Sequence, residues 1–195
     1  MGAILENRCQ GKGVIKAVSI SKEKGTKKHT AAQVILKENY GIVGDAHAGS
    51  SRQVSLLAEE SIVKMREKGL KVKPGDFAEN IVTKGIDLKG LNIGAKIKIG
   101  KNVILEITQL GKECLHPCAI YYKVGDCIMP REGIFAKVLK GGMVKSKDAI
   151  QVITLNMYRA AVLTISDKCS QGEREDQSGK VVQELIRQIA VKIVK

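Results

Sequence analysis

The chain is poor in aromatic residues: it has no tryptophan, two phenylalanines and four tyrosines among 195 residues. Proteins that bind single-stranded nucleic acid stack successive bases on aromatic side chains, so this shortage argues against such a function. The formal net charge is nevertheless +13, carried mainly by lysine. A charge of this sign attracts anions in general, from nucleic acid to an acidic protein or a phosphorylated cofactor. The positive charge therefore predicts an anionic partner, but it does not identify which anion is bound.

Long apolar runs are also missing. No stretch of about eighteen consecutive apolar residues is present, which argues against a membrane-spanning helix. The first eight residues lack the charged-then-apolar layout of a secretory signal peptide. We therefore expect a soluble, cytoplasmic protein with no membrane partner. In that compartment, five cysteines are more typical of metal binding or sulfur chemistry than of a disulfide framework.

Short strands and glycine-containing turns dominate the first 155 residues. Strands are expected at 14–21, 32–37 and 149–155, and a hairpin at 96–108, where two alternating apolar runs flank a three-residue connection with glycine. A helix is expected at 55–68, because Ala58, Ile62 and Met65 share one helical face, and a short one at 132–139. This spacing favours a mainly β domain, mostly antiparallel and closed into a barrel with a few short helices, over residues 1–155.

The pattern changes after residue 155. Residues 159–166 form a near-continuous apolar run, typical of a strand buried on both faces of a parallel sheet. A polar loop follows, and apolar residues from Val181 to Ile193 then repeat at helical spacing. We interpret 156–195 as an incomplete α/β fragment. Because so short a segment cannot bury enough surface alone, the apolar face of its helix is a predicted association surface.

Three of the five cysteines and one of the three histidines lie within fourteen residues. The four residues are Cys114, His116, Cys118 and Cys127. They offer enough soft ligands for a tetrahedral zinc site, although zinc-binding pairs usually leave about two to four residues between ligands and Pro117 restricts this turn. Alternatively, the thiols are buried and inert, because free cysteine is among the most buried residue types.

Reactive thiolate chemistry is the third interpretation, and the one we favour. Cations close in sequence would lower the pKa of these thiols; they are Lys112, His116, Lys123 and Arg131. A thiolate in such a field ligates a soft transition metal or carries a sulfane sulfur as a persulfide. Charge alone does not decide between these two outcomes.

A second polar cluster lies in the glycine-rich segment 41–53. Its glycines, Gly44 among them, permit close approach of backbone to a ligand. Asp45 supplies a negative charge, His47 a titratable ring, and Arg52 a cation suited to bidentate recognition of phosphate or carboxylate. The alternative is an ordinary glycine turn in which Asp45 caps its own backbone.

Two further segments carry polar groups. In 74–81, Glu79 and Asn80 interrupt an apolar approach to a strand. Asn80 would present its amide to a polar ring or, as is more common, satisfy a turn. Residues 22–28 form a lysine-rich loop that we interpret as a solvated charge run.

Taken together, these segments resemble the MOSC family, the domains related to the C-terminal part of molybdenum cofactor sulfurases. The matching motifs, in order, are GIVGDAH from Gly41, RQVSLL from Arg52, GDFAENI from Gly75, GIDL from Gly85, IG at Ile93, GKEC from Gly111, PC at Pro117, GDCIMPREG from Gly125, and Gly141-Gly142. They span most of residues 10–155. The resemblance implies a β-barrel and a pocket for the pterin cofactor of molybdenum or tungsten, with a cysteine that ligates the metal or delivers sulfur.

The resemblance also assigns roles residue by residue. Cys118 is the first choice for the catalytic thiol and the molybdenum ligand, and Cys127 the second, because relatives differ in which thiol meets the metal. Cys114 belongs to the shorter bacterial pattern only. Arg52 and nearby lysines would anchor the cofactor phosphate. The full set of implied cofactor-binding residues is Gly44, Asp45, His47, Arg52, Asn80, Cys114, His116 and Arg131.

Several functions remain open within this resemblance. Short bacterial members lack the pyridoxal-phosphate desulfurase domain of sulfurases, and no pyridoxal-phosphate site is identifiable here. The alternatives are sulfur transfer, cofactor storage and completion of a reductase, with a cofactor-biosynthesis protein or a molybdoenzyme as partner.

Residues 161–179 resemble the opening of the molybdopterin-binding domain of enzymes that adenylylate molybdopterin. The later nucleotide-binding turn of that domain is missing, so we predict no adenylylation. The competing hypothesis is a zinc-stabilised basic binding module without catalytic activity.

Overall fold

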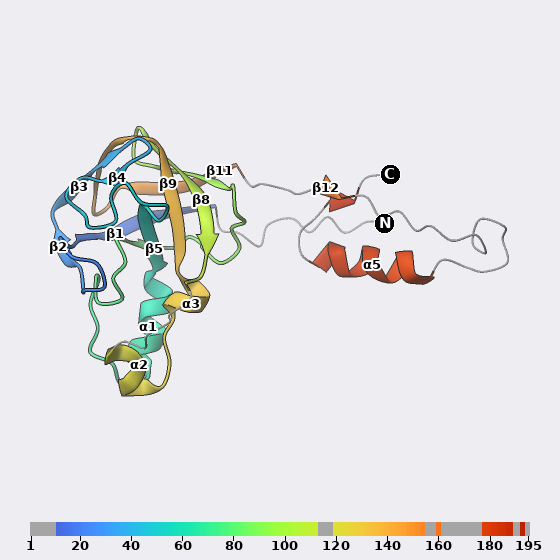
Figure 1. The fold of residues 1–195 in the computed structure, drawn as a ribbon, viewed down its shortest axis with the longest axis horizontal. Coiled ribbons are helices and arrows are strands. Elements are labelled where there is room, and N and C mark those ends of the chain that lie inside the picture. The colour runs from blue at the N-terminus through green and yellow to red at the C-terminus, as the bar shows by residue number, and fades with distance from the viewer. Residues whose placement is uncertain (1–10, 113–118, 155–158, 161–176, 189–191, 194–195) are drawn as a thin grey trace. The chain divides into compact units, whose positions relative to one another are not determined.

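The computed structural model describes residues 11–112, 119–154, 159–160, 177–188 and 192–193. The chain divides into two compact units, Met1–Leu155 and Asn156–Lys195 (Figure 1). Among the described residues, none of the helices has the length and apolar character needed to cross a membrane.

The first unit is a closed, mixed β-barrel, as the sequence predicts. Seven strands follow one another around it in the order β11-β7-β8-β9-β5-β6-β1, and pairing of β1 with β11 closes the ring. Strands β5 and β6 are parallel, and the other neighbours are antiparallel. The barrel strands are β1 (Lys12–Ile20), β5 (Val54–Ala58), β6 (Ile81–Lys84), β7 (Lys96–Ile99), β8 (Val103–Leu110), β9 (Ile134–Lys140) and β11 (Ala149–Thr154).

Four further strands extend this framework. Strand β2 (His29–Ala31) pairs with β1. A three-stranded sheet has the order β10-β3-β4 and is formed by β10 (Gly142–Lys145), β3 (Gln33–Lys37) and β4 (Gly41–Ile42). The short β4 opens the glycine-rich segment and is held by β3, so this small sheet fixes where that segment starts.

The barrel wall is covered on both faces. On β9, Ile134 and Ala136 belong to the core inside the barrel, whereas Phe135 packs into a second core outside it. The outer core lies under three helices: α1 (Glu59–Glu67), α2 (Ala119–Val124) and α3 (Met129–Glu132) (Figure 1). Among the described residues, aliphatic side chains with almost no exposed surface fill the inside of the barrel and leave no room for a ligand there.

The helix expected at 55–68 is present but starts later, the short helix expected at 132–139 is wrong, and both errors have the same reason. Residues 55–58 are the end of strand β5, and the helix begins only at Glu59. Residues 134–139 lie in strand β9 rather than in a short helix. Since both strands are buried on both faces, they lack the apolar-polar alternation of a half-covered strand, and a short continuous apolar run does not distinguish strand from helix. The hairpin at 96–108 and the strands β1, β3 and β11 agree with the sequence.

In the second unit, β12 (Arg159–Ala160) pairs in parallel with β13 (Lys192–Ile193). Helix α5 (Gln177–Gln188) lies between them in the chain, which is the order of a βαβ crossover. The predicted helical repeat through Ile193 is therefore wrong at its end, because Ile193 pairs with Ala160 as a strand. The remainder of the predicted strand, 161–166, lies outside the described residues.

Candidate functional site

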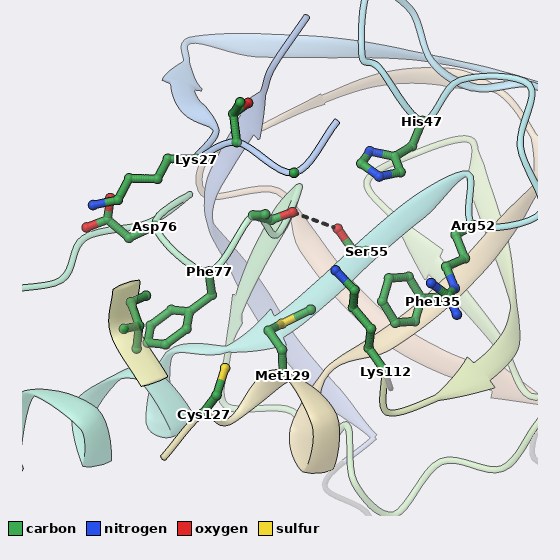
Figure 2. A pocket seen from close by; sticks show the side chains of 14 residues that line it. Lys27, His47, Arg52, Ser55, Asp76, Phe77, Lys112, Cys127, Met129 and Phe135 are labelled. Atoms are coloured by element: carbon green, nitrogen blue, oxygen red, sulfur yellow. Dashed lines mark hydrogen bonds and ion pairs between the residues drawn. The ribbon is translucent and has the colours of Figure 1, made fainter. Parts of the chain in front are cut away.

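A cavity of ≈ 330 Å³ opens on the outer face of the barrel wall (Figure 2). Its wall includes Ser55 of β5 and Phe135 of β9, which are direct partners across the two strands. The other lining residues are Gly25, Thr26, Lys27, His47, Arg52, Asp76, Phe77, Ala78, Lys112, Ile120, Cys127 and Met129. Cavities that take small ligands measure roughly 300 to 1,000 Å³, so this one, which we call the cysteine cavity, is large enough for a small cofactor.

Three cations and one carboxylate line the cysteine cavity: Lys27, Arg52 and Lys112 against Asp76. The Lys27 Nζ lies 3.4 Å from the Asp76 Oδ1, so that pair is already neutralised. Figure 2 shows Arg52 and Lys112 on the side of the cavity formed by Phe135. The excess of positive charge therefore lies on that side and favours an anionic ligand.

The Arg52 guanidinium is held in place before any ligand binds. Its Nε donates to the Gln109 Oε1 over 2.9 Å, and its Cζ lies 5.3 Å from the centroid of the Phe135 ring. Its two terminal nitrogens have no partner among the described residues. A guanidinium fixed at Nε and stacked on a ring presents a ready fork of donors to a phosphate or carboxylate.

His47 is oriented by a buried carboxylate. The Asp45 Oδ1 accepts a hydrogen bond from the His47 backbone N–H (3.0 Å) and lies 3.4 Å from the ring Nδ1. The Asp45 Oδ2 accepts from the Lys28 Nζ (2.5 Å), the Asn80 Nδ2 (3.0 Å) and the Ser21 N–H (3.2 Å). Burial alone would raise the pKa of Asp45, but the hydrogen bonds from His47 and Lys28 outweigh it and hold that pKa well below its usual range. A permanent carboxylate beside Nδ1 favours a proton there and leaves Nε2 for the cavity.

Asn80 is completely buried behind the cavity and is not among its lining residues. Its Oδ1 accepts from the Ser55 N–H (3.1 Å) and Oγ (2.9 Å). Its Nδ2 donates to the Ser19 carbonyl (3.1 Å) as well as to Asp45. Asn80 thus ties strands β1 and β5 to the glycine-rich segment, and its contribution to the site is to position other residues.

The remaining predicted site residues fall into three groups. Cys127 lines the cavity and is 8% exposed. Gly44 is exposed in a left-handed turn (φ 81°), and Arg131, outside the lining, pairs through Nη2 with the Asp126 Oδ1 at 2.7 Å. Three of the four possible zinc ligands lie outside the described residues: Cys114, His116 and Cys118. Across the part of the chain that is described, no three His, Cys, Asp or Glu side chains gather as a metal site.

Our interpretation of 22–28 as a solvated charge run is wrong at its end. Lys28 is only 2% exposed and its ammonium pairs with Asp45, and Lys27 lines the cavity. The Lys28 N–H donates to the Gly75 carbonyl over 2.9 Å, which holds the end of this loop against the segment that leads to Asn80. A buried aspartate requires a cation as its partner. The sequence shows neither that Asp45 is buried nor that Lys28 is that partner.

The cavity is also lined by residues that the sequence does not single out as site residues, among them Phe77, Ala78, Met129 and Phe135. Ala78 adopts a left-handed backbone (φ 63°), which is strained for a residue with a Cβ and costs about 1 to 2 kcal/mol. Such strain is often found at binding sites. The sequence around Ala78 gives no indication of this left-handed conformation.

The buried Glu79 shapes the same loop. Its Oε1 accepts from the Gly75 N–H (2.6 Å) and its Oε2 from the Phe77 N–H (3.1 Å). Burial raises the pKa of Glu79 to about 7, against the lowering effect of these backbone N–H groups. This carboxyl therefore changes its charge near neutral pH while it supports the edge of the cavity.

The raised pKa of Glu79 predicts a pH dependence of stability. Because the value is about 4.5 in the unfolded chain and about 7 in the folded one, the folded state binds the extra proton between these values, and stability falls as pH rises through that window. Denaturation by urea at about pH 5 and about pH 7.5 measures the fall. Glu79→Gln should remove this part of it, and equal pH dependence in both proteins would contradict the prediction.

Comparison with known proteins identifies the barrel. A model of the MOSC domain family matches residues 43–151, more than half of the chain. Among solved structures, the YuaD protein from Bacillus subtilis matches with a TM-score of 0.62 and 19% identity, covering 72% of this chain and 95% of that one. YiiM from Geobacillus stearothermophilus matches with 0.54 and 16% (72% and 75% covered), and YiiM from Escherichia coli with 0.51 and 16% (93% and 87% covered). At these identities the structures establish a shared fold. The comparison with curated proteins found no match.

Proposed function

Because this chain belongs to the MOSC domain family, which is associated with molybdenum cofactor sulfurase-like proteins, we propose that its barrel unit binds a molybdopterin-type cofactor. A cysteine would serve in metal ligation or sulfur transfer during maturation or delivery of that cofactor. The observation that carries the proposal is a cationic cavity with Cys127 in its lining. The partner would be a cofactor-biosynthesis protein or a molybdoenzyme.

The residues present fit such a cofactor. Its phosphate is an anion, and Arg52 offers a preorganised fork with Lys112 beside it in the lining. The apolar side chains of Phe77 and Met129 bound the space in which a pterin would lie. His47, whose Nδ1 faces Asp45, would offer its Nε2 to a polar edge of the ring.

The thiols would supply the soft ligand. When bound, the cofactor provides a metal centre that prefers sulfur donors. A cation close to a cysteine favours its thiolate form, and a thiolate either ligates the metal or holds a sulfane sulfur as a persulfide. Cys127 is the described thiol of the cavity, and Cys118, outside the described residues, remains the first choice by resemblance.

Purification of the full chain under reducing, anaerobic conditions tests the proposal. Elemental analysis and mass spectrometry together report metal, pterin and persulfide. Molybdenum or tungsten with pterin would support it. One equivalent of zinc, with unfolding on chelation, would favour the zinc-stabilised module instead. Nucleic-acid affinity that falls steeply with salt, with no metal, would favour a nucleic-acid binder.

Replacement of the thiols distinguishes their roles. We expect Cys118→Ala to abolish retention of molybdenum or sulfur while the circular dichroism spectrum stays that of the wild type. Cys127→Ala serves as the comparison, because its position in the cavity predicts a partial loss. If Cys118→Ala retains as much metal and sulfur as the wild type, Cys118 is not part of the site.

Arg52→Lys tests the preorganised anion site. The variant keeps the charge but loses the fork and the hydrogen bond to Gln109, so we expect pterin retention to fall by about tenfold, the effect of losing roughly 1.4 kcal/mol of binding. Arg66→Lys makes the same chemical change within the barrel unit, with loss of the Arg66 Nε hydrogen bond to the Val72 carbonyl, and Arg66 does not line the cysteine cavity, so it is the control. Equal pterin content in Arg52→Lys and the wild type would show that the guanidinium does not anchor the ligand.

A further inference from the structure

Two buried carboxyl groups lie next to lining residues of the cysteine cavity, and only one of them has cations around it. The Asp45 Oδ2 lies 2.5 Å from the Lys28 Nζ, and its Oδ1 lies 3.4 Å from the His47 Nδ1. Glu79 has no exposed surface, yet its carboxyl has no ion-pair partner among the described residues. Because burying a carboxylate without a cation is costly, Asp45 stays ionised, whereas Glu79 readily takes up a proton.

The other charged groups near Glu79 do not remove this difference. Asp76, on the same loop, is a second carboxylate, and Lys27 of the neighbouring loop pairs with it at 3.4 Å. Strands β1 and β5 contribute Ser19 and Ser55 to the adjoining contacts, and both are uncharged. Burial raises the pKa of Glu79 to about 7, and the charge of Asp76 adds to this rise, against the lowering effect of the backbone N–H groups. Near neutral pH the carboxyl therefore exists in both charge states.

Glu79 is connected directly to the wall of the cavity. Its Oε1 accepts from the Gly75 N–H (2.6 Å) and its Oε2 from the Phe77 N–H (3.1 Å). Residues 76–78, which this carboxyl holds from behind, line the cavity (Figure 2). A change in the charge of Glu79 therefore acts on the ligand in two ways, through the electrostatic potential and through the position of this loop.

We propose that Glu79 links ligand binding in the cysteine cavity to proton uptake: its neutral carboxyl permits an anionic ligand, and its ionised carboxylate opposes one. The proposal rests on the proposed function for the ligand, an anionic pterin, and adds how its binding is regulated. Arg52 and Lys112 attract the anion, while a negative charge behind the opposite wall repels it. Affinity therefore falls as pH rises through neutrality. Because linkage is reciprocal, the bound anion also favours protonation of Glu79.

A stable pterin probe tests this linkage on the full chain. The probe is pterin-6-carboxylate, whose carboxylate stays ionised above about pH 6 and whose fluorescence follows binding. We expect its affinity to fall about fivefold or more between about pH 6 and about pH 7.5. Glu79→Gln, which is uncharged at both values, should lose most of this fall. His47→Gln is the control, because it removes the other titratable ring of the cavity; it should bind more weakly at both values and keep the fall.

Proton uptake can also be measured without any change to Glu79. Calorimetry near pH 7 in two buffers of different ionisation enthalpy counts the protons that are taken up when the probe binds. We expect net uptake in the wild type and in His47→Gln. This measurement decides the question even if Glu79→Gln does not fold.

Equal affinity at both pH values, with no proton uptake, would overturn the inference and leave the proposed function standing. A fall that persists in Glu79→Gln and disappears in His47→Gln would assign the effect to His47 and also overturn it. No binding of the probe at either pH would count against the proposed function and remove this inference with it.

Discussion

Lys28→Met should lower the free energy of unfolding by about 3 to 5 kcal/mol, the usual loss when one partner of a buried ion pair is removed. The Lys28 Nζ lies 2.5 Å from the Asp45 Oδ2, and both side chains have almost no exposed surface. Methionine fills a similar volume but leaves the Asp45 carboxylate buried without its cation. Denaturation in urea, followed by circular dichroism because the chain has no tryptophan, measures the loss.

Lys68→Met is a matched control for this prediction. The Lys68 Nζ also lies 2.5 Å from an aspartate oxygen, that of Asp126, but the lysine side chain is 50% exposed. Exposed pairs contribute about 0 to 1 kcal/mol because water screens them. The two variants therefore make the same chemical change at the same separation and differ in burial. Equal losses of stability would show that burial of the Lys28–Asp45 pair is not what makes it important.

Gly75→Ala should be the most disruptive of the glycine substitutions in the loop beside the cysteine cavity. Gly75 has φ 92°, and a Cβ added there would lie 2.2 Å from the carbonyl oxygen of Lys28, the residue that precedes strand β2. The left-handed conformation costs about 1 to 2 kcal/mol for a residue with a Cβ, and overpacking adds about 1 to 3. We expect a total loss of about 2 to 5 kcal/mol.

Gly69→Ala separates the two contributions. Gly69 has nearly the same backbone angle, φ 87°, but nothing lies within 4 Å of an added Cβ. Its loss should therefore be the conformational part alone, about 1 to 2 kcal/mol. The difference between the two variants in urea denaturation measures the contact with Lys28. If the two variants are equally stable, the loop beside the cavity moves to make room for the methyl group.

The two contacts connect stability to the site. Lys28 pairs with Asp45 through its side chain and packs against Gly75 through its backbone. Asp45 in turn orients His47, and Gly75 begins the loop that carries Phe77 to the cavity. Disturbing Lys28 should therefore change both walls of the cavity as well as the stability of the barrel.

Some of the site could be predicted from local pattern. Arg52 and His47 stand in a glycine-rich segment with the composition of an anion site, and both line the cavity. Cys127 belongs to the dense group of thiols and also lines it. The resemblance to the MOSC family is confirmed by the family match over 43–151. These features depend on residue type and spacing, which the sequence displays directly.

Other parts of the site depend on contacts between distant segments. The family resemblance implies a pocket role for Asn80, but its amide is used by Ser19, Ser55 and Asp45, because those segments meet only in the folded barrel. The helix expected at 132–139 includes Phe135, but this residue lies in β9 and faces the cavity because β9 pairs with β5. No local rule reveals such a partner, since each contact joins positions many residues apart in the chain.

The sequence by itself determined the family, the barrel and the chemical character of the site, because repeated short strands, glycine turns and the cysteine and arginine motifs are local properties. The tertiary structure decided which side chains face the cavity. Aliphatic side chains fill the inside of the barrel, and helices cover part of its outer wall, so the cavity forms where β5 and β9 meet the covering segments. Whether a lysine such as Lys28 is solvated or buried follows from the segment packed against it, which is a property of the fold and not of its neighbours in sequence.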